Sequence, residues 1–142
     1  MEPLVLPGDL SSLSPARDYV RAAASAVGLG EKRIYALALA VDEIVTNIVM
    51  HGYEEHGAAG DVRLSALQSP AELKIDIEDT APAFDPGIRK ADTHADEMDK
   101  PLSERPVGGL GIFLAVQSLD RFDYRRESGR NINTIGMRLE RA

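Results

Sequence analysis

The sequence predicts a two-layer α+β sandwich, in which helices cover one face of a mixed but mostly antiparallel sheet. Residues 62–67 and 73–79 alternate apolar and polar side chains, the pattern of strands that have one buried face. Residues 68–71 form a short turn that joins these strands as a hairpin. Residues 31–51 repeat their apolar side chains every three to four positions, which indicates an amphipathic helix. Hairpin-linked strands with helices on one face favour this sandwich over a doubly wound parallel sheet.

The first third of the chain adds one strand and one helix. Residues 4–6 are apolar and are bracketed by prolines, which suits a short edge strand. Ser14 as cap and Pro15 at the first helical position predict a helix that continues to Val27. The apolar surface of this helix is either ordinary core or a homodimer contact; it consists of Val20, Ala23, Ala24 and Val27.

After the second hairpin strand the chain becomes irregular. A polar, acidic tract over residues 87–106 is long for a loop in a compact domain, and such loops are usually functional lids or disordered segments. The glycines of residues 108–111 end this tract and open a helix that reaches Leu119. Two strands and the turn between them close the chain, at residues 121–125, 131–139 and 128–129.

Composition narrows the functional class. The 142 residues, 44% of them hydrophobic, predict a single domain over residues 1–142. A net charge of -7 argues against a nucleic-acid binder and against anchoring to an anionic membrane. The absence of cysteine excludes disulfides and thiolate metal sites. No uninterrupted apolar run approaches membrane-spanning length and the N-terminus lacks the features of a signal peptide, so we expect a cytoplasmic protein.

The central helix carries two polar residues suited to chemistry. Glu43 and Asn47 stand four positions apart, and His51 continues the same line on the helix. The carboxylate can accept a proton and the amide oxygen can hold a magnesium ion, although such a pair by itself is usually a solvated helix face. His51 followed by Gly52 is most simply a helix C-terminus.

Two further features suit a nucleotide. The glycine tract of residues 108–111 leads into a helix, so its backbone N–H groups either face an anion or serve as a hinge. It is neither a Walker A loop nor a dinucleotide fingerprint, because no Lys-Ser/Thr follows and no strand precedes it. Asp79 ends a strand, where it either shapes a turn or accepts a hydrogen bond from an exocyclic amine such as that of adenine.

Taken together in this order, these segments resemble the GHKL ATP-binding domains, and within them the stand-alone anti-sigma-factor serine/threonine kinases of bacteria. Residues 40–53 resemble the N-box, residues 79–86 the G1 box and residues 106–112 the G2 box of that family. Residues 129–134 match its closing strand, so the resemblance covers nearly the whole chain.

This resemblance implies the Bergerat fold, with ATP and Mg²⁺ as cofactors. Glu43 matches the general base of the family, Asn47 its magnesium ligand and Asp79 its adenine-binding aspartate. The backbone of residues 109–111 would cover the phosphates, and Thr134 would lie near the base. The nucleotide-binding residues that the resemblance implies are Asn47, Asp79, Ala81, Phe84, Gly108, Gly109, Leu110, Gly111 and Thr134. One of them departs from the family, because Ala81 stands where a glycine is common.

The implied function is transfer of the ATP γ-phosphate to a serine or threonine of an anti-sigma-factor antagonist, by a protein that also binds a sigma factor or similar regulator. Histidine autophosphorylation is disfavoured, because the chain has three histidines and no separate dimerisation helix to present one. The alternative is a binding module that sequesters a regulatory partner in a nucleotide-dependent way without phosphoryl transfer.

Overall fold

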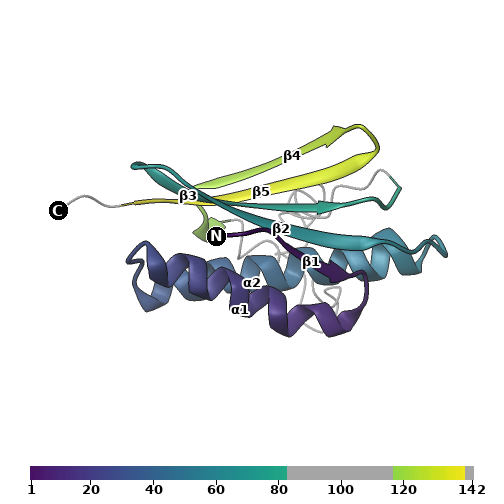
Figure 1. Cartoon of the computed structure of the whole chain (residues 1–142), viewed down its shortest axis with the longest axis horizontal. Helices are drawn as coiled ribbons and strands as arrows, with labels where there is room; N and C mark the ends of the chain where they lie inside the picture. The colour runs from purple at the N-terminus through teal and green to yellow at the C-terminus, as the bar shows by residue number, and fades with distance from the viewer. Residues whose placement is uncertain (83–116, 140–142) are drawn as a thin grey trace, which may run out of the picture.

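Two layers make up the structure, a five-stranded sheet and a pair of helices packed against one of its faces (Figure 1). The computed structural model describes residues 1–82 and 117–139. The strands lie in the order β1-β2-β3-β5-β4 and, in the described part of the chain, every pairing is antiparallel, where a mixed sheet was expected. The strands are β1 (Leu4–Pro7), β2 (Asp61–Gln68), β3 (Glu72–Asp79), β4 (Arg121–Glu127) and β5 (Arg130–Arg138).

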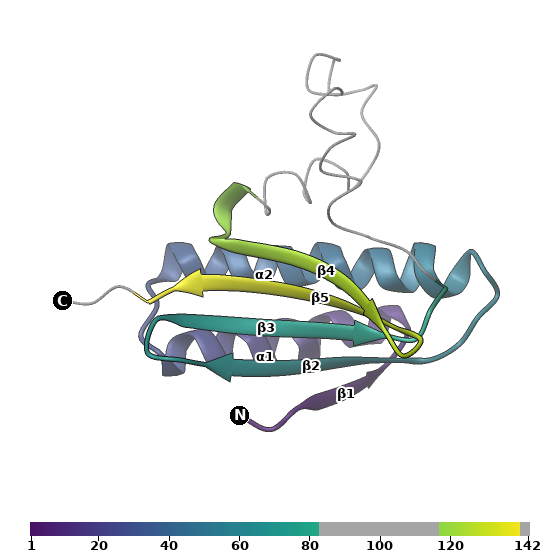
Figure 2. The same cartoon turned by 90° about the horizontal axis from the view of Figure 1, so that it is seen from above.

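The helical layer consists of two consecutive helices. A short 3-10 turn, η1 (Leu10–Ser12), leads into α1 (Leu13–Ala26), and α2 (Glu31–Asn47) continues directly into the π-helical η2 (Ile48–Glu54). Seen from above the sheet, α1 runs along the β2 and β3 side and α2 along the β5 and β4 side (Figure 2). The helix predicted over residues 31–51 is therefore present and is three residues longer.

The core lies between the two layers and follows from the sequence periodicity. On β3, alternate residues point toward the helices and are fully buried, whereas the residues between them are partly exposed. The apolar face of α2 meets these side chains, and complete burial of each large side chain contributes about 1.5–3 kcal/mol. The largest fully buried side chains include Leu37, Val41, Ile44, Ile48, Leu64, Leu73, Ile75, Ile77, Ile135 and Met137.

The structure corrects the predicted start of the first helix and decides between the two interpretations of its apolar surface. The helix begins at Leu13 rather than after a Ser14 cap, because Asp9 caps the preceding η1 turn by accepting from the Ser11 amide at 2.8 Å. Of the two interpretations of its apolar surface, ordinary core is confirmed: Val20, Ala23 and Ala24 are buried in the core between the layers, and Val27 is partly buried against it.

The end of the central helix also differs from the prediction. The chain remains helical beyond Gly52 because a π turn, with its wider hydrogen-bonding pattern, carries it on to Glu54. His56 then donates from Nδ1 to the carbonyl oxygens of His51 and Gly52, at 3.1 and 3.2 Å. Gly57 has a φ of +59°, the left-handed conformation that ends many helices. His56 and Gly57 thus take the capping roles that the sequence suggested for His51 and Gly52.

The β4–β5 hairpin has the predicted turn. Ser128 and Gly129 both have positive φ, at 50° and 78°, as a two-residue type I′ turn requires. This tight turn fixes the register of the two strands, so Arg126 lies directly opposite Asn131. The predicted helix from residue 108 to Leu119 and the tract of residues 87–106 lie outside the described residues, except for Gln117 and Ser118, which are helical.

The continuous helix from Glu31 to Glu54 has 24 residues and a mean hydropathy of 1.4 in its most apolar window, enough by length and composition to cross a membrane. From the sequence we expected no apolar run that approaches membrane-spanning length, and this helix is longer than that expectation. Half of that window is buried inside the fold, as in the core helix of a soluble protein.

Tyr53 ties the end of η2 to two strands. Its buried hydroxyl donates to the carbonyl oxygen of Asp61 at 2.7 Å and accepts from the Thr80 amide at 2.9 Å. The backbone approaches its ring closely at two glycines, because a Cβ on Gly8 or Gly60 would lie 2.8 Å from a ring carbon. The aromatic side chain therefore locks η2 against the ends of β2 and β3.

Replacement of Tyr53 with Phe should lower the free energy of unfolding by about 1–2 kcal/mol, because the hydroxyl satisfies two backbone groups. Urea unfolding followed by circular dichroism measures this change. Tyr35→Phe is the matched control, since Tyr35 is 63% exposed and its variant should stay within about 0.5 kcal/mol of the wild type. Equal effects of the two substitutions would contradict the role of the Tyr53 hydroxyl.

Candidate functional site

Three segments that are distant in the sequence meet at one end of the sandwich. The C-terminal part of α2 with η2, the C-terminal end of β3 and the β4–β5 turn all lie at the right-hand end of the molecule (Figures 1 and 2). These segments carry the residues that the sequence singled out on the helix and at the strand end.

The helix also approaches the strand end closely at Gly52 and Ala81. A Cβ on Gly52 would lie only 3.1 Å from the Cβ of Ala81, and Ala81 is 1% exposed. The methyl group at position 81 therefore has room because the facing helical residue is a glycine.

Asp79 is buried on the helix-facing side of the sheet, with 3% of its surface exposed. Its Oδ1 accepts from the backbone amide of Ala81 and from the side-chain amide of Asn131, each at 2.9 Å. Burial raises the pKa of this carboxyl above its ordinary value, and these two hydrogen bonds and the charge of Arg126 oppose the rise.

Asn131 lies opposite Asp79 in the sheet and holds the segment that follows it. Its Nδ2 donates to Asp79 and also to the carbonyl oxygens of Ala81 and Pro82, at 3.1 and 3.2 Å. One buried amide thus fixes both the carboxylate and the backbone of Ala81 and Pro82, within the segment that the sequence matched to the G1 box.

The amide oxygen of Asn131 also accepts two hydrogen bonds. Its Oδ1 accepts from the hydroxyl of Tyr124 at 2.6 Å and from Nη1 of Arg126 at 2.9 Å. Both partners come from β4, so the amide joins three adjacent strands at the edge of the site.

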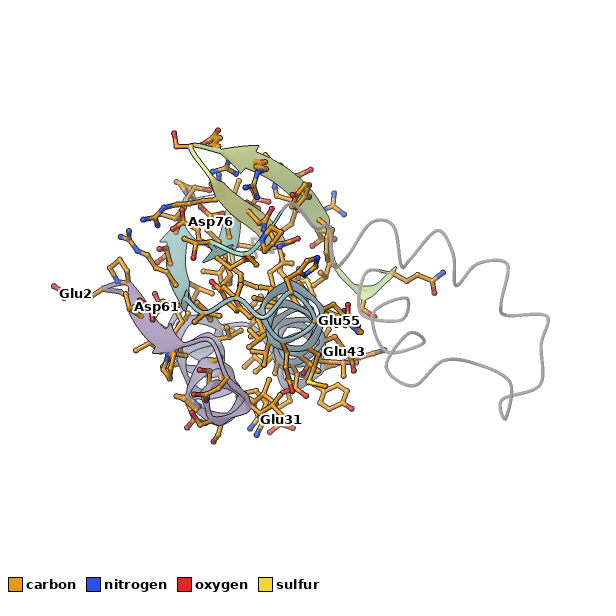
Figure 3. All side chains as sticks on the ribbon, turned by 90° about the vertical axis from the view of Figure 1, so that its right-hand side faces the viewer. Glu2, Glu31, Glu43, Glu55, Asp61 and Asp76 are labelled. Carbon is orange, nitrogen blue, oxygen red and sulfur yellow. The ribbon has the colours of Figure 1, made fainter. Side chains whose placement is uncertain are left out.

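Glu43 and Asn47 occupy successive turns of α2. Glu43 is half-buried on the side of the helix that faces away from α1 (Figure 3), and Asn47 is 7% exposed. Burial, and next the negative charge of Asp42, raise the pKa of the Glu43 carboxyl. Asp42 itself pairs with Arg17 of α1 at 2.6 Å, on another side of the helix.

His51 belongs to the π-helical segment. Its Nδ1 lies 2.7 Å from Oε1 of Glu55. Because a π turn holds more residues than an α turn, His51 does not continue the line that Glu43 and Asn47 form on α2. Single-turn π segments occur frequently at functional sites, and this one directly follows Asn47.

The amino-acid sequence matches the histidine kinase-like ATPase domain family over residues 6–139. The chain belongs to this family. The curated relatives include the serine-protein kinase RsbW of Staphylococcus aureus, 32% identical over 95 residues, which cover 67% of this chain and 60% of the relative. The RsbW of Halalkalibacterium halodurans is 27% identical over 126 residues, or 89% of this chain and 76% of the relative. The chain thus spans 60% of the length of the first of these kinases.

Solved structures show the same fold. The SiaB-SiaC complex of Pseudomonas aeruginosa aligns with a TM-score of 0.58 and 13% identity over 97% of this chain and 89% of that chain. The histidine kinase domain of the Erythrobacter litoralis EL346 blue-light activated histidine kinase aligns with a TM-score of 0.54 and 19% identity over 89% and 60% of the two chains. The predicted GHKL-type family and its α+β sandwich are therefore confirmed.

In this ATPase domain Thr134, which was expected near the base, does not lie on the same face of the closing strand as the residue that contacts Asp79. Thr134 lies on the opposite face of the sheet, where its hydroxyl donates to Asp76 at 2.6 Å (Asp76 is labelled in Figure 3). The side chain beside Asp79 is that of Asn131. Side chains alternate between the two faces along a strand, so residues 131 and 134, three positions apart, point to opposite faces. Every second residue of a strand lies on the same face, and Ile135 is apolar and buried. The alternation from Ile135 back along the strand would therefore have placed Asn131 on the helix-facing side.

Several residues that the sequence assigned to the ATPase site lie outside the described residues. They are Phe84, Gly108, Gly109, Leu110 and Gly111. Contacts of these residues with a nucleotide stay predictions.

The described residues could supply only part of the ligands that a magnesium ion needs. They contain no group of three or more His, Cys, Asp or Glu side chains that could hold a metal ion. Magnesium in phosphate-transfer sites is commonly held by one or two protein oxygens together with phosphate and water. The amide oxygen of Asn47 fits such a role.

The contact between Gly52 and Ala81 gives a prediction about packing. Gly52→Ala should be more favourable by about 1 kcal/mol in an Ala81→Gly background than in the wild type, because the second change makes space for the new methyl group. Urea unfolding of the four proteins in this double-mutant cycle measures the coupling. Gly30→Ala has nothing within 4 Å of its new Cβ and should combine additively with Ala81→Gly. An additive Gly52 cycle would rule out the contact.

The raised pKa of Asp79 gives a prediction about pH. A carboxyl whose pKa is higher in the folded than in the unfolded protein binds more protons when folded, so its contribution to stability falls as pH rises through that folded value. Asp79→Asn removes this effect and keeps an oxygen that accepts hydrogen bonds. The variant should therefore gain stability relative to the wild type at pH 7, and the gain should shrink near pH 4.

Urea unfolding at the two pH values tests this prediction. Asp76→Asn, the same substitution on the opposite face of β3, is the control at both pH values. A loss of stability in Asp79→Asn that is equal at both pH values would show that burial does not disfavour the ionised carboxylate.

Proposed function

We propose that this domain is an ATP-dependent serine/threonine protein kinase of the anti-sigma-factor type. The observation that carries the proposal is the contact of Gly52 with Ala81, which brings the helix of Glu43 and Asn47 against the segment that follows Asp79. The names of the curated relatives, both serine-protein kinases, support the same reaction class.

In this proposal Asp79 recognises the adenine base. Within the described residues its hydrogen bonds all go to Oδ1, so Oδ2 is the atom that accepts the exocyclic amine of adenine. Because Asn131 and the Ala81 amide orient the carboxylate before the nucleotide arrives, binding requires little reorganisation. Ala81 is compatible with this role, since its methyl group packs against Gly52.

Asn47 would hold magnesium through its amide oxygen. When bound, the ion supplies charge neutralisation at the phosphate oxygens, which is the main requirement of phosphoryl transfer. Asn47 lies one turn after Glu43 on α2, so the proposed metal ligand and the proposed base would be neighbours on one helix.

Glu43 acts as the general base. The hydroxyl oxygen of the acceptor serine or threonine forms the new bond to the γ-phosphorus, the bond from that phosphorus to the β–γ bridging oxygen breaks, and ADP leaves. The hydroxyl proton passes to the Glu43 carboxylate, a transfer commonly worth about 10²–10⁴ in rate. The raised pKa of Glu43 suits this role, because it strengthens the base.

The proposed acceptor is an anti-sigma-factor antagonist, and a sigma factor or a similar regulator is the second proposed partner. Such a protein would act in the cytoplasm in the control of transcription. Both partners are proposed from the relatives and from the resemblance of the N-box and G1 box.

Glu43→Gln should reduce phosphoryl transfer at least about 100-fold while ATP affinity stays near the wild-type value, because only the proton acceptor is lost. Transfer to a candidate antagonist is followed with radiolabelled ATP, and ATP binding by calorimetry. In the wild type the rate should rise with pH through the raised pKa of Glu43, since the base acts when deprotonated.

Glu54→Gln is the control, because Glu54 is exposed at the end of η2 and should transfer at the wild-type rate. Phosphoryl transfer by Glu43→Gln at the wild-type rate would show that Glu43 is not the general base. A tight complex with the antagonist without any phosphate mass shift would instead favour a sequestering module.

A further inference from the structure

Asn133 is a buried amide without hydrogen bonds. It lies on β5, two residues after Asn131 and on the same helix-facing side of the sheet. It is 0% exposed, and neither its Nδ2 nor its Oδ1 has a hydrogen-bond partner. It is the one such side chain in the described part of the chain, and buried amides in folded proteins are almost always satisfied.

The strands around Asn133 explain why it finds no partner inside the protein. Its cross-strand neighbours are Ile77 and Tyr124, and the Tyr124 hydroxyl is turned toward Asn131. The next residue on the same face of β5 is Ile135. An apolar residue of similar size at position 133 would fit these neighbours better, so the amide lowers the stability of the ligand-free protein.

We propose that Asn133 binds the edge of the adenine ring beside Asp79. This inference rests on the proposed function and adds a base-contacting residue to that site. Asn133 is a diagonal cross-strand neighbour of Asp79, and such neighbours are about 7–8 Å apart, close enough for one flat base to contact both side chains.

The chemistry of the two side chains favours adenine when they act together. A carboxamide offers a donor next to an acceptor and matches the amino group and ring nitrogen of adenine. It can also turn over and match the carbonyl and ring N–H of guanine. The ionised carboxylate of Asp79 accepts only, so it pairs with the amino group of adenine and disfavours the guanine carbonyl.

The base edge can be mapped on the wild-type protein without any substitution. Calorimetry measures the affinity for ATP, 1-deaza-ATP and 7-deaza-ATP. Each deaza analogue lacks one ring nitrogen of adenine. Loss of the nitrogen that accepts from Asn133 should weaken binding about tenfold, the effect of one buried hydrogen bond. Equal affinity for all three nucleotides would overturn the inference.

Asn133→Leu then assigns the contact. The variant should melt at a higher temperature than the wild type without nucleotide, bind ATP about tenfold more weakly and no longer distinguish the sensitive deaza analogue. Ile135→Val, on the same face of β5, is the control and should retain the full discrimination between the analogues. A structural role alone would alter the melting temperature and leave nucleotide affinity unchanged.

The failure of this inference differs from that of the proposed function. Wild-type affinity and discrimination in Asn133→Leu would overturn the role of Asn133 while ATP binding stood. A wild-type protein that binds no adenine nucleotide at millimolar concentration with magnesium would overturn both.

Discussion

The hydrogen bond between the buried carboxylate of Asp79 and the amide of Asn131 is the interaction on which the candidate site depends. A carboxylate that is nearly inaccessible to water must be satisfied by fixed donors, or the fold is destabilised. Asn131 supplies one donor and the Ala81 amide another, both to the same oxygen. Because Asn131 also binds Tyr124 and Arg126 of β4, the hairpin at the sheet edge becomes part of the support of the carboxylate.

The helix formed by α2 and η2 has two roles, and each uses a different face. One face fills the core with large aliphatic side chains, and another presents Glu43 toward the side away from α1 (Figure 3). The π turn after Asn47 extends the helix to Tyr53, whose hydroxyl fastens it to β2 and β3. Near this anchor Gly52 allows close approach to Ala81, so the helix is fixed next to the strand end that carries Asp79.

Local periodicity was sufficient to predict most elements of the fold. The strands at residues 62–67 and 73–79 were placed to within one residue at each end, because their alternation is a local consequence of one buried face. The turn at Ser128 and Gly129 was equally readable, because its backbone conformation requires such residues.

What the sequence could not supply was information that depends on pairing between distant strands. Thr134 was expected near the base, and Asn131 was not singled out, because only the register of β3 with β5 decides which side chain of the closing strand faces Asp79. The π turn was not predicted either, and its residue Tyr53 is bonded to a strand that comes later in the chain. The unpaired amide of Asn133 likewise becomes visible only when all of its neighbours are placed.

The two carboxyl groups of the site share one physical cause and differ in how it is offset. Burial raises the pKa of both Glu43 and Asp79. At Asp79 two hydrogen bonds and the charge of Arg126 oppose the rise without cancelling it, so these fixed partners lessen the cost of ionising a buried carboxyl. At Glu43 the neighbouring charge of Asp42 adds to the rise, which favours a group that takes up a proton. The hydrogen-bond donors around Asp79 suit a carboxyl that recognises a ligand, whereas the negative charge beside Glu43 suits one that takes up a proton, and this is the division of roles in the proposed kinase.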